Sequence, residues 1–258
     1  MRDFLERLIC DAGNQAKEYY LRGVQFSTKS HPVDLLTETD TAVSEFLVNA
    51  IHRAYPEHHI KSEEMKDDIN PGAAYEWLID PIDGTRSFAH GLPYWGVIIA
   101  VVKDGEPYMA AVYFPMEDDL FFAEQGKGAY RNGKRIQVSQ KQTLEHTRGL
   151  ISRAVEGVGS YGVYFDRFRH VFANIAVDTD ISIMNTAASC SYAYVASGSV
   201  DFAIGNSGLD WDRIGPLLIC REAGAKVTDS DGNDWKRGRQ DCVVANPTLH
   251  PHVMTLFT

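Results

Sequence analysis

The residues best placed for chemistry form the segment 80–85, Asp-Pro-Ile-Asp-Gly-Thr. A short apolar run, residues 75–79, precedes it and predicts a buried strand. Asp80 and Asp83 therefore follow the end of this strand, three residues apart. If a helix begins near Thr85, its free backbone amides can bind an anion. The alternative is a structural role, in which Asp83 caps the helix and Asp80 closes the turn.

Three further acidic positions extend this pattern. Glu63 follows an apolar residue after a predicted helix, Asp40 precedes that helix, and Asp212 precedes a helix near the C-terminus. Each has a structural alternative: Glu63 belongs to a solvated acidic stretch, and the two aspartates are helix caps. Taken together, they describe a chain that repeatedly places carboxylates at strand ends and helix starts. Oxygen-rich sites of this kind suit hard cations such as Mg²⁺.

The elements that must position these acids change in character along the chain. Apolar residues at helical spacing predict one helix in the opening segment and a second after residues 37–40, which ends before Pro56. Alternating patterns with Asp-Gly and Asn-Gly turns then predict antiparallel strands. These strands are expected near residues 75–79, 95–102, 108–114 and 120–123.

The second half alternates between strands and helices, which favours a layered α/β arrangement. Strands are expected at 150–151, 181–184, 201–204, 225–228 and 242–245, and helices at 164–176, 187–196 and 212–223. We expect an N-terminal half, residues 1–146, that carries the antiparallel sheet and most of the acids, and a C-terminal α/β half, residues 147–258. No linker rich in Pro or Gly separates them, so the halves are expected to share an interface as one compact unit.

The overall charge is acidic, with a formal net charge of -10 over 258 residues. Proteins that bind nucleic acids carry basic surfaces, so no nucleic-acid partner is expected. An acidic chain also repels an anionic substrate, unless bound divalent cations invert the local charge.

The four cysteines form no close pair of the metal-binding or redox kind. Charged residues interrupt the N-terminal segment, which excludes a secretory signal, and no apolar stretch reaches membrane-spanning length. A cytoplasmic protein with no membrane partner is therefore expected.

The sequence resembles the inositol-monophosphatase-like family of lithium-sensitive, magnesium-dependent phosphatases, collinearly over nearly the whole chain. The resemblance rests on Ser62-Glu63-Glu64, on the segment 80–85, and on Trp211-Asp212 followed by Glu222-Ala223-Gly224. It implies a layered α-β-α-β-α sandwich, which is commonly a homodimer. The implied reaction is hydrolysis of a small phosphate monoester such as an inositol or sugar phosphate.

Carried onto this sequence, the resemblance implies two or three Mg²⁺ ions. Glu63, Asp80 and the carbonyl of Ile82 would hold the first, and Asp80, Asp83 and Asp212 the second, with Asp80 bridging. A third, weaker ion would lie by Glu63. Two cations about 3.5–4 Å apart can clamp the attacking and leaving oxygens of an in-line displacement.

The resemblance also implies how the phosphate and the water are held. Gly84 and Thr85 would offer backbone amides to the phosphate. Thr85, paired with Asp40, would orient and help deprotonate the water, so these two and Glu63 form the predicted catalytic set. Lys29 matches a lysine near that site. Lithium is expected to inhibit by occupying a magnesium position after the chemical step.

Two positions depart from the inositol enzymes. Gly205 stands where the animal enzymes have a glutamate that contacts the cyclitol hydroxyls. A glycine has no side chain for those hydrogen bonds, so a strong preference for inositol phosphate is not expected. Arg86 stands where many inositol enzymes have a small polar residue. It meets a second anionic group or is a surface arginine early in a helix.

Other predicted substrate contacts come from the second half. Ala187 and Ala188 match a stretch that lines the substrate pocket in the family, although small residues there also suit helix packing. Asp210 and Arg213 flank the metal acid Asp212 and could touch the substrate. Relatives hydrolyse inositol phosphates, fructose bisphosphate, histidinol phosphate or 3'-phosphoadenosine 5'-phosphate, and the sequence does not select among them.

A second class of function stays open. A regulatory protein could keep the metal and phosphate pocket but act through a partner, including machinery associated with nucleic acids. A structural calcium site fits poorly, because such sites often use one contiguous loop and these acids span most of the chain.

Overall fold

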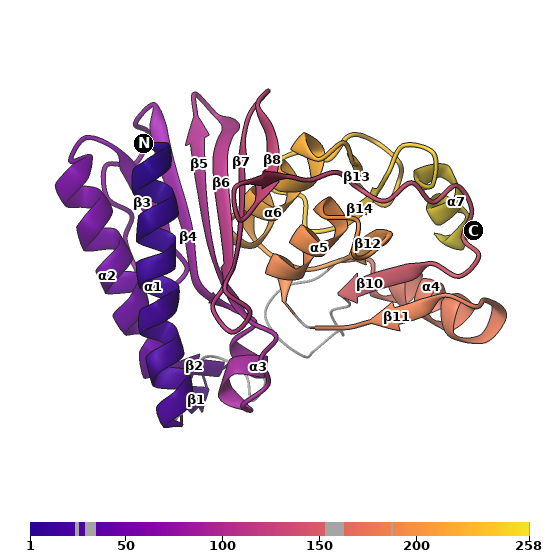
Figure 1. The fold of residues 1–258 in the computed structure, drawn as a ribbon, viewed down its shortest axis with the longest axis horizontal. Coiled ribbons are helices and arrows are strands. Elements are labelled where there is room, and N and C mark those ends of the chain that lie inside the picture. The colour runs from indigo at the N-terminus through magenta and orange to yellow at the C-terminus, as the bar shows by residue number, and fades with distance from the viewer. Residues whose placement is uncertain (24–25, 29–34, 153–162, 187, 258) are drawn as a thin grey trace.

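The computed structural model describes residues 1–23, 26–28, 35–152, 163–186 and 188–257. Five layers follow one another across the molecule (Figure 1). Two long helices cover one face of a large sheet, a second helical layer separates this sheet from a smaller one, and further helices cover the outer face of the smaller sheet. This is the α-β-α-β-α order expected from the sequence.

The outer helices are α1 (Arg2–Arg22) and α2 (Glu38–Ala54). Both bury residues at helical spacing, including Leu5, Ile9, Val43 and Leu47, which are fully inaccessible. Between them, β1 (Phe26–Thr28) and β2 (Leu35–Thr37) pair in an antiparallel ribbon. α2 begins directly after β2, so Asp40 lies in its first turn.

The first sheet has seven strands in the order β3-β4-β5-β6-β7-β8-β9. Only β3 and β4 pair in parallel, and the other neighbours are antiparallel. The strands are β3 (His59–Ser62), β4 (Tyr75–Asp83), β5 (Gly96–Lys103), β6 (Glu106–Phe114), β7 (Asp119–Glu124), β8 (Gly128–Arg131) and β9 (Lys134–Arg135). The short helix α3 (Thr85–Ala89) follows β4.

The second sheet has five strands in the order β11-β10-β12-β14-β13. They are β10 (Arg148–Ser152), β11 (Ser182–Met184), β12 (Phe202–Gly205), β13 (Lys226–Thr228) and β14 (Cys242–Ala245). The helices α4 (Phe165–Asp178), α7 (His250–Met254) and η2 (Thr255–Phe257) supply apolar residues to its outer face.

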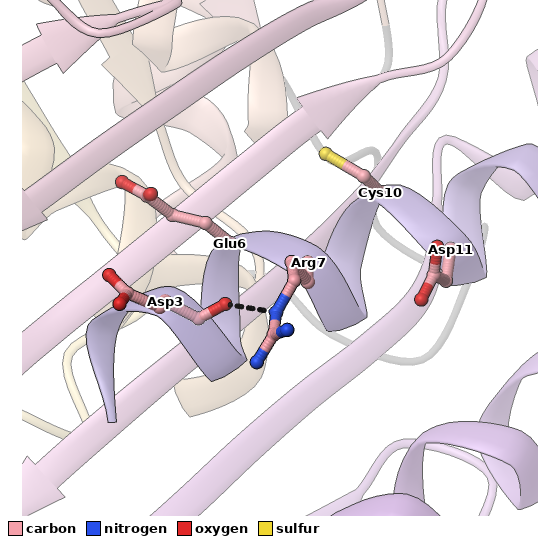
Figure 2. A pocket seen from close by; sticks show the side chains of 5 residues that line it. All are labelled: Asp3, Glu6, Arg7, Cys10 and Asp11. Atoms are coloured by element: carbon pink, nitrogen blue, oxygen red, sulfur yellow. Dashed lines mark hydrogen bonds between the residues drawn. The ribbon is translucent and has the colours of Figure 1, made fainter.

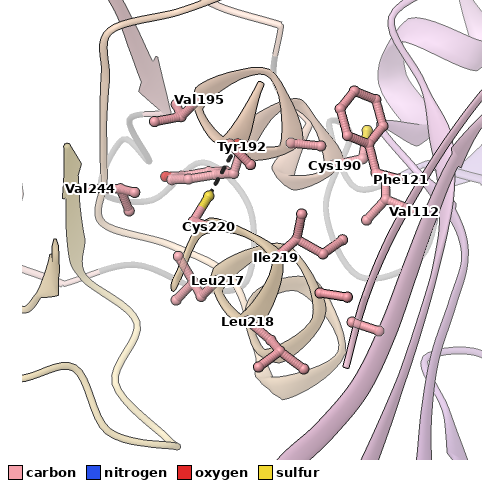
Figure 3. Close-up of a cluster of buried hydrophobic side chains, with 14 of the residues drawn as sticks. Val112, Phe121, Cys190, Tyr192, Val195, Leu217, Leu218, Ile219, Cys220 and Val244 are labelled. Atoms are coloured by element: carbon pink, nitrogen blue, oxygen red, sulfur yellow. Dashed lines mark hydrogen bonds between the residues drawn. The ribbon is translucent and has the colours of Figure 1, made fainter. Parts of the chain in front are cut away.

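The middle layer holds η1 (Ser189–Tyr192), α5 (Ala193–Ala196) and α6 (Asp210–Glu222). Figure 3 shows residues of this layer packed between Val112 and Phe121 of the first sheet and Val244 of the second. α6 lies close to the first sheet, because a Cβ on Gly215 would come within 2.9 Å of Ile98 Cγ2. A helix from the second half of the chain thus covers the inner face of the first sheet.

The predicted elements lie close to their expected places, with a few differences, whereas the strands β1, β2, β3, β8 and β9 and the helix α7 were not predicted. α6 begins at Asp210 rather than at residue 212. In place of the helix predicted over 187–196 there are a 3₁₀ turn and a single α turn from Ser189, and residue 187 lies outside the described residues. The boundary near residue 146 falls between the two sheets, and its standing as a domain boundary stays a prediction.

Candidate active site

Three carboxylates meet where β4 faces α6. One carboxylate oxygen from each of Asp80, Asp83 and Asp212 lies within 4.8 Å of the other two. Asp80 and Asp83 are buried, and Asp212 is partly buried. The sequence separation between the last two exceeds a hundred residues, so only the packing of α6 on the first sheet brings them together.

The alternation of β4 explains which way Asp80 points. Trp77 and Ile79 belong to the core beneath α1 and α2, whereas Leu78 belongs to the core shared with α6. Because successive side chains of a strand point to opposite faces, Asp80 faces the same side as Leu78. The pairing of β4 with β5 shifts register between Asp80 and Asp83. This irregularity re-aims the chain, as β-bulges do next to functional sites.

Asp83 is tied to the start of η1. Its two carboxylate oxygens accept hydrogen bonds from the backbone amides of Ser189, at 3.0 Å, and of Cys190. Burial raises the pKa of Asp83 above its ordinary value, while the hydrogen bonds from Cys190 and Ser189 act to lower it. Asp83 is therefore fixed in orientation by a segment from the second half of the chain.

Asp212 is fixed by its own helix. Its Oδ2 accepts a hydrogen bond from the backbone amide of Leu209 at 2.6 Å, within the first turn of α6. Burial raises the pKa of Asp212 to about 7, and the charges of Glu63 and Asp83 contribute. The Leu209 hydrogen bond and the charge of Arg213 act to lower this pKa, but burial and the neighbouring carboxylates outweigh them.

Asp80 carries the clearest sign of a missing ligand. Its Oδ1 is buried and has no hydrogen-bond partner. Burial raises the pKa of Asp80 well above its ordinary value, and the charges of Glu63, Asp83, Asp212 and Asp40 raise it further. A buried polar atom without a partner is costly. A divalent cation would satisfy it and offset the repulsion, so the donor set fits a hard metal ion.

Glu63 lies at the end of β3, beside the cluster. Its backbone amide donates to the carbonyl of Ile79 at 3.0 Å, which holds residue 63 next to the end of β4. Its charge acts on all three clustered acids, although its carboxylate is not one of the three close oxygens.

The structure also brings Thr85 and Asp40 together. The Thr85 hydroxyl lies 3.4 Å from Asp40 Oδ1 and 2.9 Å from the carbonyl oxygen of Ile82. Gly84 has a φ of +88°, and a Cβ there would lie 2.7 Å from the carbonyl oxygen of Tyr94. Only glycine suits this position. The helix that follows, α3, has five residues.

The remaining predicted contacts are more scattered. Arg86 is exposed on α3, and Ala188 is buried against Gly84. Both carboxylate oxygens of Asp210 are engaged, by Arg237 Nε at 2.6 Å and by the backbone amide of Gly238 at 3.2 Å. Lys29 and Ala187 lie outside the described residues, so their predicted roles stay predictions.

The space beside Gly205 is occupied by other side chains. A Cβ at this position would lie 2.2 Å from Tyr192 Oη and 2.8 Å from Arg213 Nη2. Arg213 is buried, and its Nη2 donates to the carbonyl of Ser207. Where the animal inositol enzymes have a glutamate, this chain thus places a phenol and a guanidinium, which sequence reasoning did not foresee.

A groove along α1 lies apart from these acids. It has a volume of about 530 Å³ and is lined by Asp3, Glu6, Arg7, Cys10 and Asp11 (Figure 2). α1 covers the face of the first sheet opposite to α6, so the groove and the carboxylate cluster lie on different sides of that sheet. Among the described helices, none is both long and apolar enough to cross a membrane.

Comparison with known proteins agrees with this fold and identifies a family. The model of the inositol monophosphatase family matches residues 1–258. The "Fructose-1,6-bisphosphatase/inositol-1-monophosphatase" of Thermotoga maritima is 32% identical over 98% of this chain and 93% of its own length. The "Nus factor SuhB" of Pseudomonas aeruginosa is 36% identical, over 85% of this chain and 84% of its own.

Solved structures show the same architecture. Thermotoga maritima IMPase superposes with a TM-score of 0.88 and 29% identity, covering 99% of this chain and 95% of that one. The extragenic suppressor protein suhB of Bartonella henselae gives a TM-score of 0.90 at 25% identity, covering 100% and 98%. The chain has the layered α+β fold of these proteins, with a cluster of three acidic residues where β4 meets α6. The chain belongs to the inositol monophosphatase family, whose members are generally metal-dependent phosphatases.

Proposed function

We propose that this chain hydrolyses a small phosphate monoester with the help of Mg²⁺ ions. The observation that carries the proposal is the buried, unpartnered Oδ1 of Asp80, which lies in a cluster with Asp83 and Asp212. In this proposal those three acids, Glu63 and the carbonyl oxygen of Ile82 hold the ions. The carbonyl of Ile82 already accepts a hydrogen bond from Thr85, and its second lone pair is available to a cation.

When bound, the metal lowers the pKa of a water molecule and offsets charge on the leaving oxygen. The chain's own residues position the reactants. Thr85, between Asp40 and the Ile82 carbonyl, orients the attacking water and passes its proton toward Asp40. The backbone amides of Gly84 and Thr85 receive the phosphate. No covalent nucleophile is needed.

The substrate class follows from the shape beside Gly205. Tyr192 and Arg213 fill that space, so no carboxylate is available there to select cyclitol hydroxyls. A site built to bind a substrate hydroxyl discriminates by about 10⁴-fold or more, and its loss relaxes that discrimination. We expect activity on several small esters, with inositol 1-phosphate not strongly preferred. Histidinol phosphate and 3'-phosphoadenosine 5'-phosphate belong in the test panel.

The test is magnesium-dependent phosphate release from inositol, sugar, histidinol and nucleotide phosphates. Asp80→Asn is expected to lower turnover by about a thousandfold or more, since it removes the proposed bridging ligand. Asp201→Asn is the matched control, because Asp201 is an equally buried carboxylate that accepts from the backbone of Arg148 and lies outside the cluster. Near-normal activity of Asp80→Asn would falsify the proposed site.

Arg86 allows a finer test of the substrate. If its exposed guanidinium meets a second anionic group, Arg86→Ala should lower kcat/KM for bisphosphates more than for matched monophosphates. Equal losses on both would leave Arg86 with a general electrostatic role.

A second candidate, a non-catalytic regulatory protein, is favoured by one observation. Several relatives, including that of Pseudomonas aeruginosa, bear the name Nus factor SuhB rather than that of a phosphatase. The expectation of no nucleic-acid partner does not fit these names, whereas the regulatory function through nucleic-acid-associated machinery does. An absence of phosphate release across the whole panel, together with intact Mg²⁺ binding, would favour this function.

The cytoplasmic location, the homodimer and the lithium sensitivity are also proposals, and the last two have direct tests. Lithium is titrated at saturating Mg²⁺, and inhibition is expected if it takes a cation position among the acids. Sedimentation gives the oligomeric state.

A further inference from the structure

Arg237 joins two carboxylates that belong to the elements of the candidate metal site. Its Nη1 and Nη2 donate to Glu76 Oε2 and Oε1 at 2.6 and 2.9 Å, and its Nε donates to Asp210 Oδ2 at 2.6 Å. The next residue, Gly238, adds a backbone hydrogen bond to Asp210 Oδ1 at 3.2 Å. A bidentate guanidinium–carboxylate pair fixes geometry as well as charge.

These contacts connect strand β4 to helix α6. Glu76 is the second residue of β4, and Asp210 is the first residue of α6. Arg237 lies on the segment between β13 and β14. From there it contacts both β4, at Glu76, and α6, at Asp210. Glu76 is buried apart from a small exposed fraction, so it is not an ordinary surface partner.

The same two elements meet again at the metal acids. Glu76 and Asp80 are four residues apart on β4 and point to the same face, with Leu78 between them packed in the core shared with α6. Asp210 and Asp212 lie in the same first turn of α6. The first turn of α6 therefore meets β4 at two points, once through Arg237 and once where Asp212 approaches Asp80.

The second of these points repels when no cation is present. One carboxylate oxygen from each of Asp80, Asp83 and Asp212 lies within 4.8 Å of the other two, and like charges this close repel one another. Some other attraction must hold the first turn of α6 against β4, and the Arg237 bridge supplies one.

We propose that Arg237 is a positioning residue, which holds the first turn of α6 on β4 so that Asp212 stays within reach of a cation bound by Asp80 and Asp83. This inference rests on the proposed metal-dependent function. Asp210, predicted from the sequence as a substrate contact, serves in this account as the helix end of the bridge.

The chain offers a matched control on the same segment. Arg239 lies two residues from Arg237 and is similarly exposed, but its ion pairs are with Asp229 and Asp241, at 3.2 Å each, and with Asp231, at 3.8 Å. Arg239→Met removes ion pairs within the segment and leaves the contacts to β4 and α6 untouched. Arg237→Met removes the centre of the bridge, and Glu76→Gln removes the charge at its β4 end.

The experiment is a MgCl₂ titration of the wild type and the three variants. Thermal unfolding measures the stabilisation by Mg²⁺, and calorimetry measures its binding. Mutation of a residue that orients a metal ligand typically lowers the metal affinity by about 10–100-fold. Because Arg237 acts through a helix turn, we expect Arg237→Met and Glu76→Gln to need about tenfold more Mg²⁺ for half-maximal stabilisation. Arg239→Met is expected to lower the melting temperature without metal but to keep the wild-type Mg²⁺ midpoint.

The outcomes separate the two proposals. A wild type that shows no Mg²⁺ binding overturns the proposed function, and this inference with it. A wild type that binds Mg²⁺, with unchanged midpoints in Arg237→Met and Glu76→Gln, overturns only the positioning role. An equal shift in Arg239→Met would reduce Arg237 to a general stabiliser of the segment. If Arg237→Met does not fold, Glu76→Gln carries the test.

Discussion

Replacement of Asp80 is expected to raise the stability of the metal-free chain while it removes a proposed metal ligand. At neutral pH its raised pKa means that its ionised form is disfavoured in the folded, metal-free chain. Asp80→Asn removes that charge at little change in volume. We predict that the variant without metal is more stable than the wild type by on the order of 1–3 kcal/mol. It should also lose the stabilisation that Mg²⁺ gives to the wild type.

The measurement is chemical denaturation with and without MgCl₂ at pH 7.5. Asp201→Asn is the control, because that carboxylate is buried but paired, and its replacement should be destabilising. If Asp80→Asn is less stable than the wild type in the absence of metal, then Asp80 has a partner that stabilises its charge.

Gly205 is predicted to be intolerant of any side chain. In Gly205→Ala the new Cβ would lie 2.2 Å from Tyr192 Oη, so neighbouring groups must move. Overpacking of this kind costs about 1–3 kcal/mol. In a Tyr192→Phe background the closest atom is absent, and the cost of the alanine should fall by about 1 kcal/mol or more. Urea denaturation of the four proteins in the cycle checks this, and strict additivity would contradict it.

The residues that the sequence could not indicate share one property. Asp80 and Asp83 come from one short segment, and Asp212 lies within a tryptophan–aspartate pair, so local motifs disclosed them. The amides of Ser189 and Cys190 that orient Asp83, and Arg237 that engages Glu76, act across 106 to 161 positions of sequence. Such contacts depend on how the two sheets pack, and no local spacing encodes them.

At the scale of elements, α7 offers a test of pH dependence. His250, in its first turn, is buried, and its Nε2 lies 2.9 Å from the hydroxyl of Thr228 at the end of β13. Burial lowers the pKa of His250 from 6.5 to about 4, and the charge of Lys226 acts in the same direction. The folded chain therefore holds this imidazole neutral where the unfolded chain protonates it.

The sign of the effect follows from this difference. A lowered pKa in the folded state contributes stability above about pH 6.5, and that stability is lost as the pH falls toward 4. The loss approaches about 1.4 kcal/mol per pH unit in this window. In His250→Gln the group does not titrate, so the stability difference between the wild type and the variant should shrink on acidification. Denaturation at pH 7.5, 6.0 and 5.0 measures it, and a constant difference would contradict the prediction.

The ends of helices and strands were predictable where the apolar spacing was regular. The prediction failed where polar contacts determine where an element begins. The sequence placed the start of α6 at Asp212 as a cap, but the helix begins at Asp210. The Asp212 carboxylate accepts a hydrogen bond from the amide of Leu209 from inside the first turn. The segment from Ser189 became a 3₁₀ turn because Asp83 binds its first amides. β3, with the sequence His-Ile-Lys-Ser, was missed because three of its four residues are polar.

For the whole molecule, the arrangement of layers decides how it unfolds. The expected division near residue 146 separates the two sheets, yet α6, from the second half, covers the inner face of the first sheet. Without α6 this face would expose apolar side chains of five strands. Those in the shared core are Leu78, Ile98, Ala100, Val102, Ala110, Val112, Phe114, Phe121, Ala123 and Ala129.

We therefore predict a single cooperative unfolding transition for the full chain, and we predict that neither residues 1–146 nor residues 147–258 fold alone. Calorimetry should give equal van't Hoff and calorimetric enthalpies, with near- and far-UV circular dichroism melting together. Saturating Mg²⁺ should raise this one transition as a whole, because the acids that would bind it lie on both sides of the division. Two transitions, of which only that of residues 1–146 responds to Mg²⁺, would instead mean that the halves are independent domains. Asp212 would then contribute little to binding the ion.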